Sequence, residues 1–524
     1  MTRRPFLIAL AAATALAGCN LAPKYERPGG AVPPALPEGG VYPRAATDAP
    51  DVTQIGWRDF FLDPRLRQVI ETALANNRDL RIAAGNVLQA RAQYRVQRAD
   101  LVPTTTLSGS ATYTNNVFGA AGGAGGAGGG AGAGGVGGGT GTGTGTGGTG
   151  VGTGGGTGGG TGGGAGGGTG VGAGSGVGST SSNLEFYSVN AGFSAFELDV
   201  FGRVRNLSRA AQEQYFASEE AQRAARISLI SEVATAWLTM AADQELLRLS
   251  RETLKAFEQS LNLTRAQFRI GVASELEARQ AETNYQAARN DIATLQTRVA
   301  QDQNALNLLA GTTVPADQLP ATLGAQPVTR DALPGNLSSD VLLRRPDVLQ
   351  AEHQLIAENA NIGAARAAFF PSISLTATIG TISTALSGLF GGGSFTYTGA
   401  PAIGLPLFDG GRRAGNLDYA RASQQVAVAT YERAIQTAFR EVADSLAQRG
   451  TIGEQVSAQT ARAEAARVAA RLSDARYRAG VDSFLVALDA QRVAYAAQQQ
   501  LVATRQARAT NLVQLYTRLG GGLN

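Results

Sequence analysis

Apolar residues recur every three to four positions over much of this chain, which is the spacing of one helical face. Leu254, Phe257, Leu261, Thr264 and Phe268 are spaced by 3, 4, 3 and 4 residues, a heptad spacing that packs neighbouring helices side by side. Residues 202–314, and those after 406, contain no proline and are rich in good helix formers. An unbroken helix over 206–270 would be about 95 Å long, which predicts a tube or stalk rather than a compact globule.

After Pro103 the period changes to two. Apolar or small residues alternate with Ser and Thr over 104–113 and again over 372–379, and each run is followed by a return strand. The pattern predicts two hairpins, over about 104–201 and 372–408, with a bulge near Ala195–Phe196 where the first return strand changes phase. Such alternation is typical of a transmembrane barrel strand. A strand of a soluble sandwich alternates identically, so the pattern alone leaves both open.

The chain contains an internal repeat. The sequence Q-F-R-I-G-V-A-S at 267–274 matches R-Y-R-A-G-V-D-S at 476–483, and Gly202-Arg203 matches Gly411-Arg412, both 209 residues apart. Upstream, R-A-D-L-V-P at 98–103 matches R-A-A-F-F-P at 366–371, 268 residues apart. We therefore expect one architecture built twice. The predicted organisation is a first repeat over 57–314, a linker over 315–339 and a second repeat over 340–524, with helix-turn-helix tips at 271 and 480.

The change of offset marks an insertion. Residues 119–178 are nearly all Gly, Ala and Thr and hold more than half of the chain's 69 glycines. Glycine-rich chain has a high ordering entropy and little apolar surface to bury. We expect a disordered loop between the two strands of the predicted β-hairpin over about 104–201, facing the cell exterior.

The N-terminus predicts an export signal. Two arginines precede an apolar run that ends in Leu16-Ala17-Gly18-Cys19, so residues 1–18 are expected to be a signal peptide. The tetrapeptide resembles the bacterial lipobox, which would make Cys19 a lipidated first residue in the outer membrane. Acyl chains bury about 0.8 kcal/mol per CH₂. Residues 19–56, rich in Pro and Gly, are expected to be the anchor and an extended linker.

Composition excludes several classes of function. The formal net charge is +4, with one His (His353) and one Cys (Cys19). Basic residues form no cluster that would suggest nucleic acid, and no catalytic motif, metal site or disulfide framework is found. We predict a non-enzyme without a cofactor apart from the lipid on Cys19. No later stretch reaches about 18 continuous apolar residues, so no transmembrane helix is expected.

Four strands per chain cannot close a membrane barrel, which needs about eight or more. Open edges in lipid would leave backbone groups unpaired at several kcal/mol each. If the strands span a membrane, the chains must associate. Three copies would supply twelve strands above a second, helical barrel.

Several motifs together resemble the outer-membrane efflux lipoproteins of the TolC-like outer membrane factor superfamily, which serve resistance-nodulation-division pumps. The resemblance covers the whole chain except the glycine insertion. It implies a homotrimer with a twelve-stranded β-barrel, four strands per chain, continuous with a long α-helical barrel in the periplasm. Its partners would be outer-membrane lipid, a periplasmic adaptor protein and an inner-membrane pump. The motifs are C-N-L-A-P-K-Y-E-R-P (19–28), W-R-D-F-F-L-D-P-R-L (57–66), F-F-P-S-I-S-L (369–375), L-F-D-G-G-R-R (407–413) and Y-x-x-G…L-D-A-Q-R (477–492).

The resemblance also implies a periplasmic gate. Asp489 matches the gate aspartate, Leu485 an apolar ring one turn earlier, and Tyr477 a tyrosine that holds the gate closed in some members. Asp482 stands where that tyrosine's arginine partner is usual, which leaves this lock open. The expected adaptor-contact surface at the tips is formed by Gly271, Val272, Ser274, Gly480, Val481 and Ser483.

Each of these residues also has a plain structural interpretation, as a turn residue or a solvated helix face. Two other functions stay open. The exit duct of a type I protein secretion system would differ only in its partner, although such ducts commonly lack a lipobox. A surface-anchored trimeric coiled-coil adhesin is less consistent with two helix-turn-helix repeats. The transported substrate, the particular pump and the role of the glycine loop are not encoded in any motif.

Overall fold

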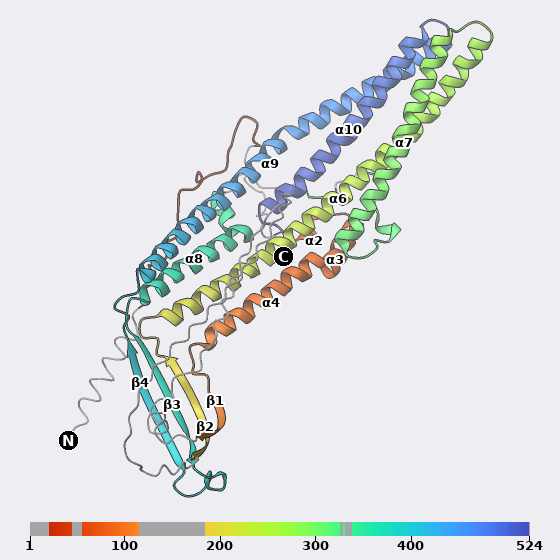
Figure 1. Ribbon diagram of the computed structural model, residues 1–524. Coiled ribbons are helices and arrows are strands. Elements are labelled where there is room, and N and C mark those ends of the chain that lie inside the picture. The colour runs from red at the N-terminus through yellow and green to blue at the C-terminus, as the bar shows by residue number, and fades with distance from the viewer. Residues whose placement is uncertain (1–19, 44–54, 115–183, 325–327, 331–337, 523–524) are drawn as a thin grey trace, which may run out of the picture. The chain divides into compact units, whose positions relative to one another are not determined.

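The computed structural model describes residues 20–43, 55–114, 184–324, 328–330 and 338–522. The predicted signal peptide, Cys19 and the glycine tract 119–178 lie outside these residues. The chain divides into a helical unit (residues 1–103, 197–374 and 402–524) and a strand unit (104–196 and 375–401). Figure 1 labels the elements of both.

The helical unit is dominated by four long helices. Helices α6 (Arg203–Arg269) and α9 (Arg412–Arg478) contain 67 residues each, which corresponds to about 100 Å. Each turns back into a partner helix, α7 (Glu275–Ala310) and α10 (Phe484–Arg518). We call α6 with α7 the first hairpin and α9 with α10 the second hairpin (Figure 1). The shorter elements are α2 (Trp57–Phe60), α3 (Pro64–Asn76), α4 (Arg78–Ala99), α8 (Pro346–Ala367) and the 3₁₀ turns Ala316–Gln318, Ser339–Arg344 and, in the strand unit, Leu386–Gly388.

The repeat read from the sequence is present in the helices. Helices α6 and α9 begin 209 positions apart and end 209 positions apart, and α4 and α8 contain 22 residues each with an offset of 268. Both long helices start after a glycine in the left-handed region, Gly202 (φ 78°) and Gly411 (φ 86°). Side chains with a Cβ rarely adopt this conformation, so the matched Gly-Arg pairs mark equivalent helix starts.

The four strands form one sheet in the order β1 (Thr106–Thr114), β2 (Leu184–Glu197), β3 (Ser372–Ser383), β4 (Phe395–Gly404). Strand β1 pairs antiparallel with β2. At the position of the predicted bulge, Ala195 has a φ of 50° and its N–H donates to the hydroxyl of Thr376 at 3.0 Å. The phase change in the sequence therefore corresponds to a real departure from extended backbone.

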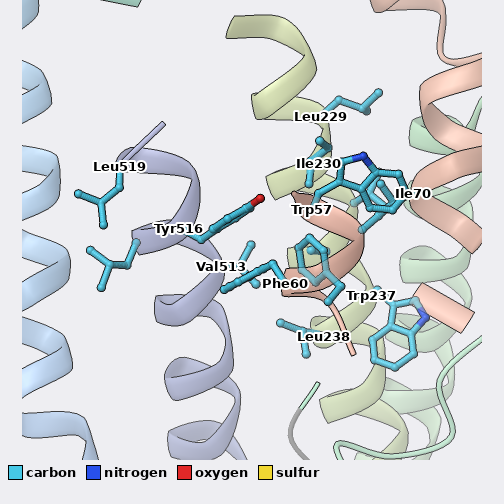
Figure 2. Close-up of a cluster of buried hydrophobic side chains, with 14 of the residues drawn as sticks. Trp57, Phe60, Ile70, Leu229, Ile230, Trp237, Leu238, Val513, Tyr516 and Leu519 are labelled. Carbon is cyan, nitrogen blue, oxygen red and sulfur yellow. The ribbon is translucent and has the colours of Figure 1, made fainter. Parts of the chain in front are cut away.

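The motif W-R-D-F-F-L-D-P-R-L forms part of the core of the helical unit. Trp57, Phe60 and Phe61 are fully buried, and the Phe60 ring stacks on Tyr516 of α10 at 3.9 Å between centroids (Figure 2). The Tyr516 hydroxyl donates to the carbonyl of Ile55 at 2.6 Å. Asp63 caps α3 by accepting from the N–H of Arg65 at 2.8 Å, with Pro64 in the first helical position, as the sequence predicts. This motif thus joins the first helices to α6 and α10.

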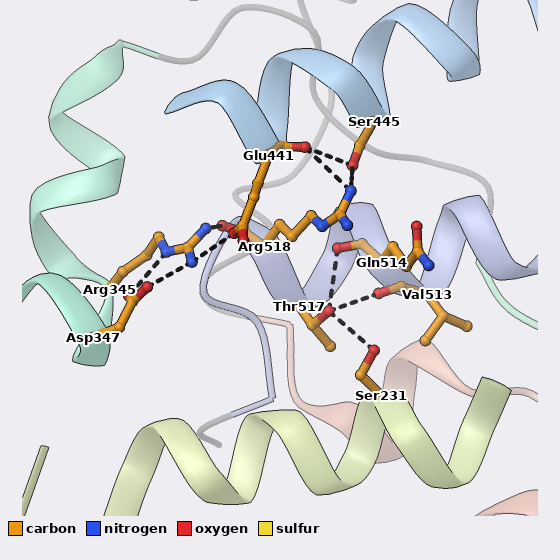
Figure 3. A network of polar contacts seen from close by, with 9 residues as sticks. All are labelled: Ser231, Arg345, Asp347, Glu441, Ser445, Val513, Gln514, Thr517 and Arg518. Carbon is orange, nitrogen blue, oxygen red and sulfur yellow. Dashed lines mark hydrogen bonds and ion pairs between the residues drawn. The ribbon is translucent and has the colours of Figure 1, made fainter. Parts of the chain in front are cut away.

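A polar network joins the start of α8 to the middle of α9 and the end of α10 (Figure 3). The buried guanidinium of Arg345 donates to Asp347 (2.7 Å), to Glu441 (3.0 Å) and to the carbonyl of Arg518 (2.8 Å). Arg518 in turn donates to the hydroxyl of Ser445 at 2.6 Å. Each of the three guanidinium nitrogens of Arg345 donates to an oxygen, and two carboxylates lie within 3.0 Å, so the buried charge is compensated.

Residues 20–43 contain no helix, as the Pro- and Gly-rich composition predicts, but several of their side chains and carbonyls are hydrogen-bonded to α8. Arg27 donates two hydrogen bonds of 2.8 Å to Glu352 of α8, and the Tyr25 hydroxyl donates a third of 3.0 Å. Further along α8, the side-chain amide of Asn359 donates to the carbonyl of Pro23 at 2.7 Å. Among the described helices, none is long and apolar enough to cross a membrane.

Candidate functional site

The two tips have the same backbone design. Gly271 (φ 77°) and Gly480 (φ 73°) follow the ends of α6 and α9 in the left-handed conformation. The N–H of Val272 donates to the carbonyl of Gln267, and that of Val481 to the carbonyl of Arg476, both at 2.9 Å. This is the Schellman arrangement that ends a helix on glycine. It places Val272 and Val481 outside the helices, 72% and 62% exposed.

The next helix begins differently at each tip. Ser274 forms a capping box with Glu277, in which each side chain accepts from the other's backbone N–H. Ser483 occupies the same position at the second tip but makes no side-chain cap. The residue three positions later is Val486, which cannot complete the box. The first tip is therefore the more strongly capped of the two.

Tyr477 links the two hairpins. Its hydroxyl donates to the Oε1 atom of Gln267, at the end of α6, at 2.5 Å. Its ring packs against Phe484 of α10, 5.5 Å between centroids. Asp482 stands where the resemblance places an arginine partner, and the Tyr477 hydroxyl bonds to Gln267 instead. No sequence signal marks Gln267 as this partner, because its repeat equivalent is Arg476 and the repeat does not pair it with Tyr477.

Asp482 is paired within its own tip. Both carboxylate oxygens accept from Arg476, at 2.6 and 2.8 Å. The hydrogen bonds from Arg476 lower the pKa of Asp482, so its carboxylate stays ionised near neutral pH. Asp482 therefore forms an ion pair within the second tip and does not bond to Tyr477, whose hydroxyl donates to Gln267.

Leu485 and Asp489 lie one turn apart on an exposed face of α10. They border a groove between α9 and α10, which we call the gate groove. Asp489 is the one charged residue among those that line it. The full lining is Ala466, Ala469, Ser473, Leu485, Val486, Asp489, Ala490 and Val493. The structure therefore brings the two predicted gate residues together, in a surface that a single chain leaves open.

The other titratable candidates have structural partners. His353 lies 2.7 Å from Glu213, between α8 and α6. Within the described part of the chain, no three His, Cys, Asp or Glu side chains form a group that could hold a metal ion.

Comparison with known proteins gives a consistent result. The sequence profile described as "Outer membrane efflux protein" matches residues 69–144, 157–312 and 337–521. The gap at 145–156 falls inside the glycine tract.

Among curated proteins, the chain is 42% identical to the toluene efflux pump outer membrane protein TtgC of Pseudomonas putida, over 97% of this chain and 93% of that protein. It is 38% identical to the cation efflux system protein CusC of Escherichia coli, over 99% and 98%. Among solved structures, the open state of the MtrE outer membrane channel of Neisseria gonorrhoeae superposes with a TM-score of 0.76 at 33% identity, covering 97% of this chain and 99% of MtrE.

Proposed function

We propose that this chain, which belongs to the outer membrane efflux protein family and is an outer-membrane efflux channel, forms the homotrimeric exit duct of a tripartite pump. In this proposal a periplasmic adaptor joins the helical tips to an inner-membrane transporter of the resistance-nodulation-division type. Small molecules pass from the transporter through the helical barrel and leave through the β-barrel.

The sheet supports association of copies. Its order leaves β1 and β4 as edges, and unpaired backbone groups in lipid cost several kcal/mol each. Pairing β4 of one copy with β1 of the next removes both edges. Three copies give the twelve strands of a closed barrel, within the range known for such barrels.

The helices support the same ring. Helix α8 packs against both α6 and α9, and its Ala357 and Ala360 cluster with Ala210 of α6. By the repeat, the equivalent of this α6–α8 contact is a contact between α9 and α4. Within one chain, however, α4 has no buried residue. On α9, the equivalents of the buried Ala210 and Ala217 are Tyr419 and Val426, 76% and 67% exposed. These open faces fit one another on neighbouring copies.

The lipid anchor rests on the lipobox at Cys19. Support comes from the segment beginning at Asn20, which is fixed to α8 through Asn359, Glu352 and Arg366. A lipid on Cys19 would then be attached to an ordered part of the channel. Anchoring in the outer membrane, with the helices in the periplasm, follows from this proposal.

The gate is proposed at the second tip. Three Leu485 side chains and three Asp489 carboxylates would surround the axis, and the Tyr477–Gln267 bond would hold the second hairpin against the first. Relatives of similar identity are named for toluene and for cation efflux. We therefore propose that the transporter, rather than this duct, selects the substrate.

The observation that carries the adaptor-docking proposal is the pair of matched, exposed glycine turns. A Cβ at Gly480 would meet no atom within 4 Å, but the left-handed backbone there (φ 73°) strains any side chain by about 1–2 kcal/mol. This cost is local to the turn, so Gly480→Arg should still give a folded trimer while blocking the docking surface. Gly453→Arg, at an exposed glycine within α9, controls for the added side chain and charge. Gly393→Arg, at an exposed glycine with a left-handed backbone (φ 93°) between β3 and β4, controls for the backbone strain and should also support efflux. A Cβ at either position meets nothing within 4 Å. We expect a deletion strain to regain resistance to dyes, solvents and metal ions with the wild type and with Gly453→Arg, but not with Gly480→Arg. Normal efflux with Gly480→Arg would overturn the docking assignment.

A further inference from the structure

The two helical hairpins meet in one hydrophobic contact. The repeat-equivalent position of this contact is not filled within a single chain. Near the tips, Phe484 and Leu488 of α10 are buried against Leu261 of α6 and Ala281 of α7. The groove between the two helices of the first hairpin is thus filled by one face of the next helix pair. Phe257 and Thr264, on the same stretch of α6, are also buried.

The repeat maps this filled groove onto the gate groove. Residues 209 positions on from Phe257, Thr264 and Ala281 are Ala466, Ser473 and Ala490, and all three line the gate groove. The small side chains leave a hollow of about 530 Å³ there. It is apolar except for Ser473 and the carboxylate of Asp489.

The same mapping identifies what should enter it. The equivalents of Phe484 and Leu488 are Glu275 and Arg279, on the first turns of α7. The Arg279 side chain is 70% exposed and pairs with Glu275 (3.3 Å) and Glu282 (3.1 Å) along its own helix. Exposed pairs of this kind contribute little, so the guanidinium is available to a stronger partner.

We propose that Arg279 of a neighbouring copy enters the gate groove and pairs with Asp489, forming a ring of three intersubunit ion pairs that holds the tips closed. This inference rests on the proposed trimer and adds the residue that neutralises its gate carboxylates. A carboxylate that becomes enclosed in an apolar groove needs such a partner. An arginine provides several donors in a planar fork that matches a carboxylate.

A second pair of positions supports the same docking. Further from the tips, the Tyr495 hydroxyl of α10 lies 2.7 Å from the hydroxyl of Ser250 on α6. The equivalents are Gln286 on α7 and Gln459 on α9. The Oε1 atom of Gln459 is buried and has no hydrogen-bond partner among the described residues, and Gln286 of a neighbouring copy would supply a donor.

Two other carboxylates near the tips already have arginine partners within the chain. Asp482 is held by Arg476, and Glu282 by Arg265 as well as Arg279. Arg492 lies on α10 itself, three residues after Asp489, and is the competing partner that a test has to separate.

Cysteine cross-linking tests the contact directly, because the native chain has only Cys19. Arg279→Cys combined with Asp489→Cys should give covalently linked dimers and trimers when isolated outer membranes are treated with a short bismaleimide, because an Arg–Asp pair holds its Cα atoms farther apart than the roughly 7 Å that a disulfide tolerates. The control pair is Arg279→Cys with Arg471→Cys, because Arg471 precedes Ser473 by two residues and so lies about 200° around α9 from it. Gln286→Cys with Gln459→Cys is an independent second pair, which should also cross-link.

Charge reversal tests the function. Arg279→Asp and Asp489→Arg, each alone, should lower the vancomycin concentration that stops growth by about tenfold, because each places like charges together in all three contacts. The double variant should recover the wild-type value, whereas Asp489→Arg with Arg492→Asp should not.

The outcomes separate the two proposals. Failure of both cysteine pairs to exceed the control, in a channel that is trimeric and active in efflux, would overturn this inference and leave the exit duct intact. A chain that forms no trimer would overturn the proposed function together with it.

Discussion

Helix α8 buries twelve of its 22 residues, whereas its repeat partner α4 buries none. The two helices have the same length and precede strands in the same way, so their local folding does not differ. What differs is the number of long helices that each of them contacts within the chain. Helix α8 lies between two long helices, while α4 has a long-helix neighbour, α6, on one side.

This contrast indicates that a single chain leaves exposed, on α4, a face that is buried on α8. Ala92 and Val96 of α4 correspond to Ala360 and Ala364 of α8, both of which are buried. Val96 itself is 58% exposed. An apolar face that its repeat equivalent buries is best explained by a neighbour that the single chain does not contain.

The largest effect should come from a charge on that face. Val96→Asp would place a carboxylate between α4 and α9 of the next copy, where an unpaired buried charge costs several kcal/mol. We expect the trimer to be lost on native gels and in cross-linking, with monomers accumulating.

The matched control is Asn86→Asp, which adds the same charge to the same helix. Its equivalent, Gln354, stays exposed on α8 although that helix has neighbours on two sides. Asn86→Asp should therefore leave the trimer intact. Loss of the trimer in both variants would point to a general effect of charge on α4 and against the proposed interface.

The helices, the strands and both tips could be predicted from the sequence, because each depends on local signals. Heptad spacing, two-residue alternation and left-handed glycines act within a few residues of one another. The positions of Leu485 and Asp489 on one face also follow from their spacing of four.

Contacts between distant segments could not be predicted in the same way. Gln267 and Tyr477 are 210 residues apart, and no periodicity identifies one as the partner of the other. The docking of residues 20–43 was missed for a related reason. Its specificity depends on Glu352 and Asn359, two polar residues that a helical pattern treats as surface.

The N-terminal segment sharpens the comparison, because its hydrogen bonds to Glu352, Asn359 and Arg366 are made with α8, in the second repeat. Glu352 is 8% exposed and accepts from Tyr25 and Arg27, whereas its equivalent in α4 is Ala84. Glu352→Gln removes the charge that these donors share, which costs about 1.5–3 kcal/mol for hydrogen bonds to a charged group. We expect trypsin to cleave after Lys24, which lies next to Tyr25 in this segment, at least about tenfold faster, since about 1.4 kcal/mol is a factor of ten. Glu358→Gln, on the same helix, should leave the rate unchanged, and equal rates in both variants would contradict this role.

A smaller difference lies between the tips. The equivalent of Tyr477 is Phe268, which has no hydroxyl, and the equivalent of Gln267 is Arg476, which is engaged with Asp482. The same bond therefore cannot form where the repeat-equivalent positions of two neighbouring copies would meet. It exists only between the two hairpins of one chain. Tyr477→Phe should destabilise the closed state of the proposed gate by about 1 kcal/mol. The measurement is a modest rise in the sensitivity of the cells to vancomycin. Adding Gln267→Leu should change little more, because the bond is already lost. Tyr285→Phe, whose ring packs against the same cluster, is the control and should behave as the wild type.

The smallest expected effect concerns a buried acid pair that the second repeat has replaced. Asp302 and Asp243 face one another between α7 and α6, and their equivalents are Asn511 and Ile452. Burial, together with the neighbouring charge of Asp243, raises the pKa of Asp302 from 3.8 to about 6. The folded chain therefore binds a proton that the unfolded chain has lost, so stability falls as pH rises from about 4 to about 6.

Asp302→Asn introduces the residue type that the second repeat has at the equivalent position, and it removes this loss of stability at higher pH. We expect the variant to be more stable than the wild type above pH 6, by up to about 1 kcal/mol after allowing for partial solvent screening. Thermal unfolding followed by circular dichroism at pH 4.5 and 7.5 measures the difference, and the advantage should be greater at pH 7.5. Asp317→Asn, at an exposed position, should show no such dependence. An equal gain at both pH values would mean that the acid pair holds no shared proton, and that the two repeats differ here in packing alone.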